Sequence, residues 1–195
     1  MADYAARASQ GHIGRARYLA SDETIRNRRD TIIKLPMQIN DVASAFKAAE
    51  TLLNLATEEA EVAASARDEK ESTELAEAWG KGATGRGMAT GGSKAIKDLE
   101  KEQKSRATRM VRDSIDGALL DLATFYRDAM MVQSGSTEAL INSDLSREIA
   151  TYSASAPASS SIKKLDSIME SRTHLAMNAA PLAVCEALMC RLAQL

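Results

Sequence analysis

Two long stretches with helical spacing surround a glycine-rich segment, and this arrangement limits the possible folds more than any other feature. The segment GKGATGRGMATGG, residues 80–92, contains six glycines, and glycine disfavours the interiors of both helices and strands. Apolar residues recur every three or four positions from Asn40 to about Trp79, and again from Ser93 to about Gln133. We therefore expect an antiparallel helical hairpin whose tip is the glycine-rich segment.

The charges of the two arms complement each other. Eight acidic residues and two basic ones lie between Glu58 and Glu77, whereas nine basic and four acidic residues lie between Lys81 and Asp113. An antiparallel hairpin places these blocks side by side and also brings the two apolar halves together. The positions expected to face the core are Val42, Ala45, Phe46, Ala49, Leu52, Leu53, Ala56, Ala60 and Ala63 in the first arm, and Val111, Ile115, Leu119, Leu122, Tyr126 and Met130 in the second.

The rest of the chain also has helical spacing, and no alternating run of β-branched residues predicts a strand. We expect an all-α helical bundle with Ser21 and Asn40 as helix N-caps, Pro36 as a helix stop, and a small-residue linker at 153–161. The further helices are expected at 2–9, 13–20, 22–35, 144–153, 162–176 and 182–195, and the apolar face of the helix at 162–176 is expected to contain Ile162, Leu165, Ile168, Met169, Leu175 and Ala176.

The composition is that of a soluble globular chain of 195 residues with a net charge of −2. No apolar run approaches the roughly 18–20 residues that cross a bilayer. The first residues, MADYAARASQGH, lack the basic, apolar and small-residue pattern of a signal peptide, so we expect a cytoplasmic protein. The two cysteines, Cys185 and Cys190, are expected to be small buried apolar groups in a reducing compartment.

Residues that could perform catalysis or hold a cofactor are scattered rather than clustered. The stretch GMATGGSK, from Gly87 to Lys94, differs from a phosphate-binding loop because its Lys and Ser are reversed and no strand precedes it. His12 and His174 each lack partners at metal-ligand spacing. We therefore predict no catalytic residue, no cofactor and no metal site, and we do not expect an enzyme.

A basic stretch in the second arm has two interpretations. Its cations could neutralise phosphates without reading base sequence, although no aromatic residues alternate with them for stacking on single strands. They could equally pair with the acidic arm, which is the interpretation we favour. The alternative function is thus a freestanding helical nucleic-acid-binding protein. The residues concerned, within Lys101–Arg112, are Lys101, Lys104, Arg106, Arg109 and Arg112.

Three segments, in order, resemble one protein family. The stretch HLAMNAAPLAVCEALMCRL is similar to the closing helices of bacterial clamp-loader subunits, which carry a Leu-x-x-Asn…Leu-x-x-Glu-x-Leu pattern. KEQKSRATRMVRDSIDGALLDLATFYRDAMMVQSG resembles the collar of the delta-prime subunits of DNA polymerase III in their actinobacterial form, and SQGHIGRARYLA is similar to their lid motif. The resemblance covers nearly the entire chain. The residues that match the collar pattern, with slightly altered spacing, are Leu175, Asn178, Leu182, Glu186 and Leu188.

The resemblance implies a domain organisation. Residues 1–36 would be a remnant of the lid of an AAA+ domain, and residues 37–195 a helical collar, so that the chain looks like a C-terminal fragment. ATP-binding relatives carry a sensor arginine in a Gly-Ser-x-Arg-Asp-Ala pattern, and the aligned position here is Gly14. Arg15 lies one residue further and points about 100° away on a helix. The resemblance therefore implies that ATP is bound by other subunits.

The resemblance also implies partners. Delta-prime acts in DNA replication as a stator of the clamp loader, and its collar would assemble with the tau/gamma and delta subunits in the cytoplasmic, nucleoid-associated replisome. It would reach the sliding clamp and primer–template DNA only through the complex. The apolar terminal helix must be buried against its own domain or another subunit, and we expect interface residues there and in parts of 115–133. The terminal-helix candidates are Leu182, Cys185, Leu188, Met189 and Leu192.

Overall fold

The computed structural model describes residues 1–79 and 91–195, and these residues form eight α-helices and two short 3-10 helices without a strand. The predicted all-α class is confirmed. Two compact units are present: unit 1 comprises Met1–Leu55 and Ile115–Leu195, and unit 2 comprises Ala56–Ser114. The domain boundary expected at residue 36 lies inside unit 1 and stays a prediction. Most of the glycine-rich segment at 80–92 lies outside the described residues.

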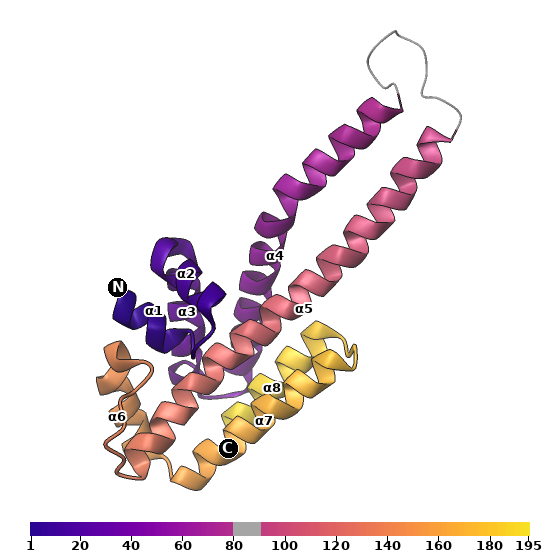
Figure 1. Cartoon of the computed structure of the whole chain (residues 1–195). Helices are drawn as coiled ribbons and strands as arrows, with labels where there is room; N and C mark the ends of the chain where they lie inside the picture. The colour runs from indigo at the N-terminus through magenta and orange to yellow at the C-terminus, as the bar shows by residue number, and fades with distance from the viewer. Residues whose placement is uncertain (80–90) are drawn as a thin grey trace. The chain divides into compact units, whose positions relative to one another are not determined.

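Three short helices begin the chain: α1 (Ala2–Ala8), α2 (Ile13–Ser21) and α3 (Glu23–Lys34) (Figure 1). The connection between the first two turns through Gln10 and Gly11, whose φ angles are 50° and 86°, and Gly11 lies at the expected joint. Glycine adopts this left-handed backbone without a Cβ penalty.

The caps of these helices differ in part from expectation. His12 caps α2, because its Nδ1 accepts a hydrogen bond from the backbone N–H of Arg15 at 3.1 Å. Asp22, rather than the predicted Ser21, caps α3, and its Oδ1 accepts from the backbone N–H groups of Thr24 and Ile25. The prediction of Ser21 was wrong because a carboxylate can both accept these bonds and interact with the helix dipole.

Two long helices, α4 (Val42–Ala78) and α5 (Gly92–Gln133), follow the 3-10 turn η1 (Leu35–Met37) that contains Pro36. Asp41, not the predicted Asn40, accepts the backbone N–H of Ser44 at 2.7 Å at the start of α4. At the start of α5, the carbonyl of Gly91 accepts the backbone N–H groups of Lys94 and Ala95, and the helix begins at Gly92, one residue before the predicted start at Ser93.

The apolar stripe of α5 is confirmed where it lies in unit 1. Ile115, Leu119, Leu122 and Tyr126 are all buried, whereas Val111 and Met130 at its two ends are half-buried. Phe125 joins the core, and its ring packs edge-on against those of Tyr126 and Tyr152. The prediction for α4 holds only in part. Its buried members are Ala45, Ala49, Leu52, Ala56 and Ala60, while Leu53 is half-buried and Ala63 is exposed.

Two members of the predicted α4 stripe are not core residues. Val42 is 54% exposed and Phe46 is 46% exposed. They belong to the first turns of α4, where no neighbouring side chains of unit 1 enclose them. The sequence pattern identified the correct helix but assigned these two side chains to the core, which was wrong.

The last elements of unit 1 are η2 (Ser143–Leu145), α6 (Ser146–Ser155), α7 (Ala158–Ala176) and α8 (Pro181–Gln194), with α7 and α8 side by side (Figure 1). Only Ala156 and Pro157 separate α6 from α7, so the linker predicted at 153–161 was wrong. The gap between the helices expected at 162–176 and 182–195 is confirmed. Asn178 there has a φ of 64°, the left-handed conformation that commonly ends a helix.

The buried face of α7 is made mainly of serines rather than of the predicted apolar residues. Ile168 and Leu175 are buried as expected, but Ile162 is 47% and Met169 is 40% exposed, while Ala176 is also exposed and Leu165 is half-buried. The hydroxyls of Ser167 and Ser171 donate to backbone carbonyls four residues earlier, which satisfies them inside the unit. The other polar members of this face are Ser160, Ser161 and Lys164.

Candidate functional site

A buried ionic network joins the N-terminal helices of unit 1 to α5. The side chain of Arg29, on α3, is only 2% exposed, and its Nε donates to Oδ1 of Asp121 at 2.8 Å. Its Nη2 donates to Oδ1 of Asn142 at 2.6 Å, and its Nη1 donates to the hydroxyl of Tyr4 at 3.2 Å. One guanidinium thus connects α1, α3, α5 and the segment before η2.

A second carboxylate completes this network. Asp128 is fully buried, and it accepts the backbone N–H groups of Ile141 and Asn142 at 3.1 and 2.7 Å. Burial by itself lowers the pKa of Arg29, but the charges and hydrogen bonds of Asp121 and Tyr4 together more than offset this effect and raise it. Arg29 therefore stays cationic at all ordinary pH values, and the network acts as a structural connection.

The position that the family alignment assigns to the sensor arginine is Gly14, in the first turn of α2. A Cβ at Gly14 would lie 3.2 Å from Cε1 of His12, which is the residue that caps this helix. The neighbouring Arg15 forms an ion pair with the buried Asp121. Its guanidinium is therefore engaged inside unit 1.

The residues that sequence analysis weighed for catalysis or metal binding do not converge. His12, the N-cap of α2, and His174, on α7, are both exposed. Within residues 1–79 and 91–195, no group of three or more His, Cys, Asp or Glu side chains is placed to hold a metal ion. Among the same residues, no helix is long and apolar enough to span a membrane. The stretch from Gly87 to Lys94 lies largely outside the described part.

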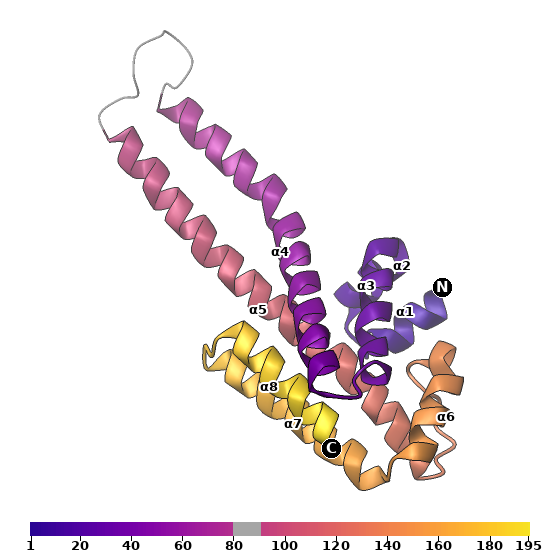
Figure 2. The same ribbon diagram turned by 180° about the vertical axis from the view of Figure 1, so that it is seen from behind.

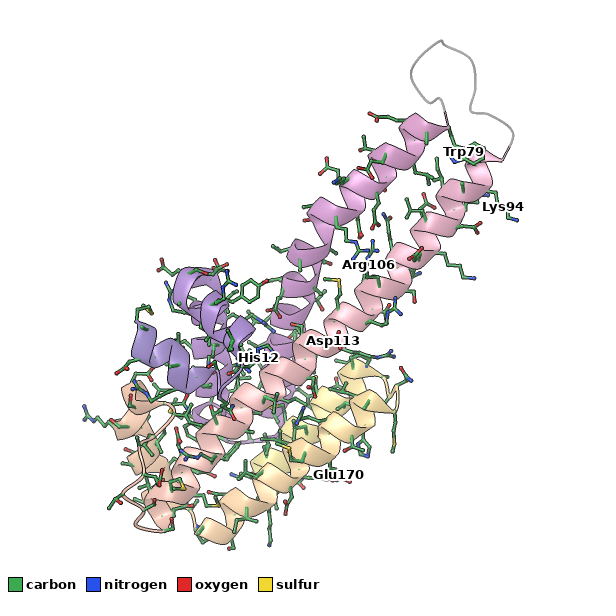
Figure 3. The ribbon with its side chains drawn as sticks, in the orientation of Figure 1. His12, Trp79, Lys94, Arg106, Asp113 and Glu170 are labelled. Atoms are coloured by element: carbon green, nitrogen blue, oxygen red, sulfur yellow. The ribbon has the colours of Figure 1, made fainter. Side chains whose placement is uncertain are left out.

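The basic and acidic arms pair within unit 2, as Figure 3 shows for Arg106, which points from α5 toward α4. Its Nη2 lies 2.5 Å from both Oδ1 of Asp68 and Oε2 of Glu71. Gln103, one turn away, donates to the backbone carbonyl of Asp68 at 3.0 Å. The predicted pairing is confirmed for Arg106. Lys101, Lys104 and Arg109 are exposed, and Arg112 is half-buried.

This pairing changes the titration of one carboxyl group. The hydrogen bonds from Arg106 and then from Arg67 lower the pKa of Glu71 from 4.5 to about 2. The Arg106 pKa is raised in turn by Glu71 and Asp68. Glu71 therefore remains ionised through the whole range in which an ordinary glutamate becomes protonated.

Most of the interface residues predicted on the terminal helix are already covered by unit 1 itself. Cys185, Leu188, Met189 and Leu192 are each at most 3% exposed, whereas Leu182 is 49% exposed. Burial raises the pKa of the Cys185 thiol to about 12. Cys190 is only half-buried, so the prediction that it is a buried group was wrong. The role of the five predicted terminal-helix residues in subunit contacts stays a prediction. Leu182 is the one of these five whose side chain has a large exposed surface.

Leu182 belongs to a groove that sequence analysis missed. The start of α4 lies beside α8 in unit 1 (Figure 2), and residues of the two helices line a groove of about 590 Å³. Phe46 is its aromatic member, and Val42 lies one turn before Phe46 on the same helix. Helical periodicity could not separate these residues from the core, because an exposed apolar stripe has the same spacing as a buried one. The other lining residues are Ala43, Lys47, Glu50 and Glu186.

Comparisons with models of protein families, with curated proteins and with solved structures found no match to this chain. The functional assignment therefore depends on the arrangement of its residues and on the resemblance noted in its sequence.

Proposed function

We propose that this chain is the non-catalytic lid-and-collar part of a delta-prime subunit of a bacterial DNA polymerase III clamp loader. Its function is to assemble with the tau/gamma and delta subunits so that the complex can load the sliding clamp during DNA replication. The observation that carries the proposal is the exposed apolar groove with Phe46 and Leu182 in unit 1. Exposed apolar side chains of this size are typical of surfaces that bind other proteins.

A second exposed apolar surface supports the same role. Ile162 and Met169 lie seven residues apart on one face of α7, and half-buried Leu165 lies between them. A subunit in a closed ring contacts one neighbour on each side. Unit 1 offers one apolar surface for each neighbour: the first with Phe46 and Leu182, the second with Ile162 and Met169.

The order of elements also supports the proposal. Three short helices precede the long ones, as a lid precedes a collar, and Arg29 fixes them to α5. The motif residue Asn178 has a structural role, because it ends α7 in the left-handed conformation before Pro181 begins α8. This turn places Leu182 at the exposed start of α8.

The proposal is tested by size-exclusion chromatography of the chain mixed with tau/gamma and delta collars. We expect Phe46→Glu with Leu182→Glu to abolish co-elution with one neighbour, and Ile162→Glu with Met169→Glu to abolish it with the other. Val62→Glu, at a position 77% exposed in unit 2, is the matched control and should leave both contacts intact. Equal co-elution of wild-type and all variants would contradict the proposal.

The nucleic-acid alternative has one specific observation in its favour. Lys94, Lys97, Lys101 and Lys104 are exposed and follow each other at helical spacing along α5. If these lysines contact four phosphates, raising the salt from 50 to 200 mM should weaken their binding to duplex DNA about a hundredfold. Binding with that salt dependence, lost in Lys97→Glu with Lys101→Glu, would favour this alternative, and no binding at 50 mM salt would remove it.

A further inference from the structure

Unit 2 contains a groove between its two helices, separate from the proposed assembly surfaces of unit 1. Its volume is about 630 Å³. Four apolar side chains line it, of which Leu75, Ala95 and Leu99 are half-buried and Ala78 is exposed. Four carboxylates line it as well: Glu71, Glu74, Asp98 and Glu102. The groove thus has an apolar floor and an acidic rim.

The position of the groove follows from the sequence of the two arms. Arg106, with Asp68 and Glu71, closes the space between α4 and α5 at one end of the groove. Beyond this ion pair, the facing positions hold small or medium side chains such as Ala78 and Ala95, which do not fill the space between two helices. A pair of helices cannot enclose a core alone, and a third helix is the usual way to cover such a stripe.

The charge of the groove indicates what can cover it. Asp98 and Glu102 form no ion pair with any other described residue, whereas Oε1 of Glu74 is paired with Nζ of Lys70 at 3.8 Å. On α5, Lys94 lies four residues before Asp98 and Lys101 three residues after it, but neither forms an ion pair with it. Lys94 points away from α4 in Figure 3. The groove therefore presents two carboxylates, those of Asp98 and Glu102, that form no ion pair among the described residues and lie beside its apolar side chains.

We propose that this groove binds a basic amphipathic helix, that is, a protein segment whose apolar stripe is flanked by lysines or arginines. The segment docks as a third helix, with its apolar residues against Leu75 and Leu99 and its cations beside Asp98 and Glu102. From Glu71 to Ala78 the groove follows about two turns of α4, so a segment of roughly ten residues covers it. This contact is independent of the proposed collar assembly, which uses unit 1.

The probe for this proposal is an 18-residue alanine-based helical peptide with leucines at i, i+3 and i+7 and lysines on both sides of that stripe. Trp79, the single tryptophan of the chain, follows the lining residue Ala78 and reports binding by its fluorescence. Calorimetry gives the dissociation constant. We expect saturable binding that becomes weaker as salt is raised.

Two matched double variants locate the binding. Asp98→Lys with Glu102→Lys should weaken binding about tenfold or more, since it places cations at the rim. Glu69→Lys with Glu100→Lys makes the same change in net charge at exposed positions outside the lining, one on α4 and one on α5, and should change the dissociation constant less than about twofold. Leu99→Gln, with helix content checked by circular dichroism, should also weaken binding.

Three results would overturn the proposal. One is the absence of binding to the wild-type chain at 1 mM peptide, which is a concentration that detects even a weak docking site. Another is equal loss in both double variants, which would indicate general charge attraction. The last is equal binding of a peptide with glutamates in place of the lysines. None of these results bears on the collar contacts of unit 1.

Discussion

At the scale of single residues, Arg29 has the largest structural consequence in unit 1. Its guanidinium is bound by Asp121, Asn142 and Tyr4, and none of these partners is near it in sequence. On α3, Arg29 lies at helical spacing from Ile25, Ile32 and Ile33, and it is buried together with Ile32 and Ile33. The sequence could not reveal the partners, because nothing local in α3 shows which carboxylate of α5 will compensate the charge.

Replacing Arg29 by Met should destabilise the chain by about 3–5 kcal/mol, because the change leaves Asp121 buried with one of its cations removed. Urea denaturation followed by circular dichroism measures this loss. Arg17→Met, at an exposed position of α2, is the control and should change the free energy of unfolding by less than about 0.5 kcal/mol. A loss below 1 kcal/mol for Arg29→Met would contradict the structural role of the network.

The ion pair of Glu71 predicts a specific pH dependence. Its pKa is lowered in the folded chain to about 2, so its pairing with Arg106 stabilises unit 2 fully above the unfolded pKa of 4.5. This contribution is lost as pH falls from 4.5 through about 2. Unfolding by denaturant between pH 6 and 2, with and without Arg106→Gln, tests this point. The wild-type chain should lose more stability than the variant over that range, and parallel curves would be inconsistent with the pairing.

At the scale of elements, the sequence predicts helices well and their buried faces less well. Periodicity located α4 and α5 to within a few residues, and the charge blocks correctly predicted that Arg106 pairs across the hairpin. It failed on α7, where serines rather than Ile162 and Met169 face the interior. A serine that bonds to its own helix backbone is compatible with burial, and hydrophobicity alone does not reveal this.

The serine face of α7 gives a prediction opposite to the usual hydrophobic rule. Ser167→Leu and Ser171→Leu should each destabilise the chain by about 1–3 kcal/mol, because a larger side chain does not fit at these tightly packed positions. Ile162→Ser should lower the free energy of unfolding by less than about 0.5 kcal/mol, since the Ile162 side chain is already half exposed. Thermal unfolding of the three variants provides the comparison. If Ser167→Leu and Ser171→Leu both stabilised the chain, the prediction that this face of α7 requires small side chains would be contradicted.

At the scale of the whole molecule, each unit offers surface to a different kind of contact. Unit 1 exposes apolar side chains on α4, α7 and α8, and unit 2 carries an acidic groove and a lysine-rich face. The sequence indicated the charged faces, because blocks of like charge are visible without a structure. It did not indicate the exposed Phe46, since only tertiary packing distinguishes a buried from an uncovered apolar position.

We propose, above all, that neighbouring subunits of a clamp loader bind unit 1. Hydrogen–deuterium exchange of the chain, alone and bound to tau/gamma and delta subunits, measures which backbone groups become protected. We expect slower exchange on binding in residues 42–50 and 181–187, beside Phe46 and Leu182, and in 160–170 around Ile162. No protection there, or protection confined to Lys94–Arg112, would contradict it.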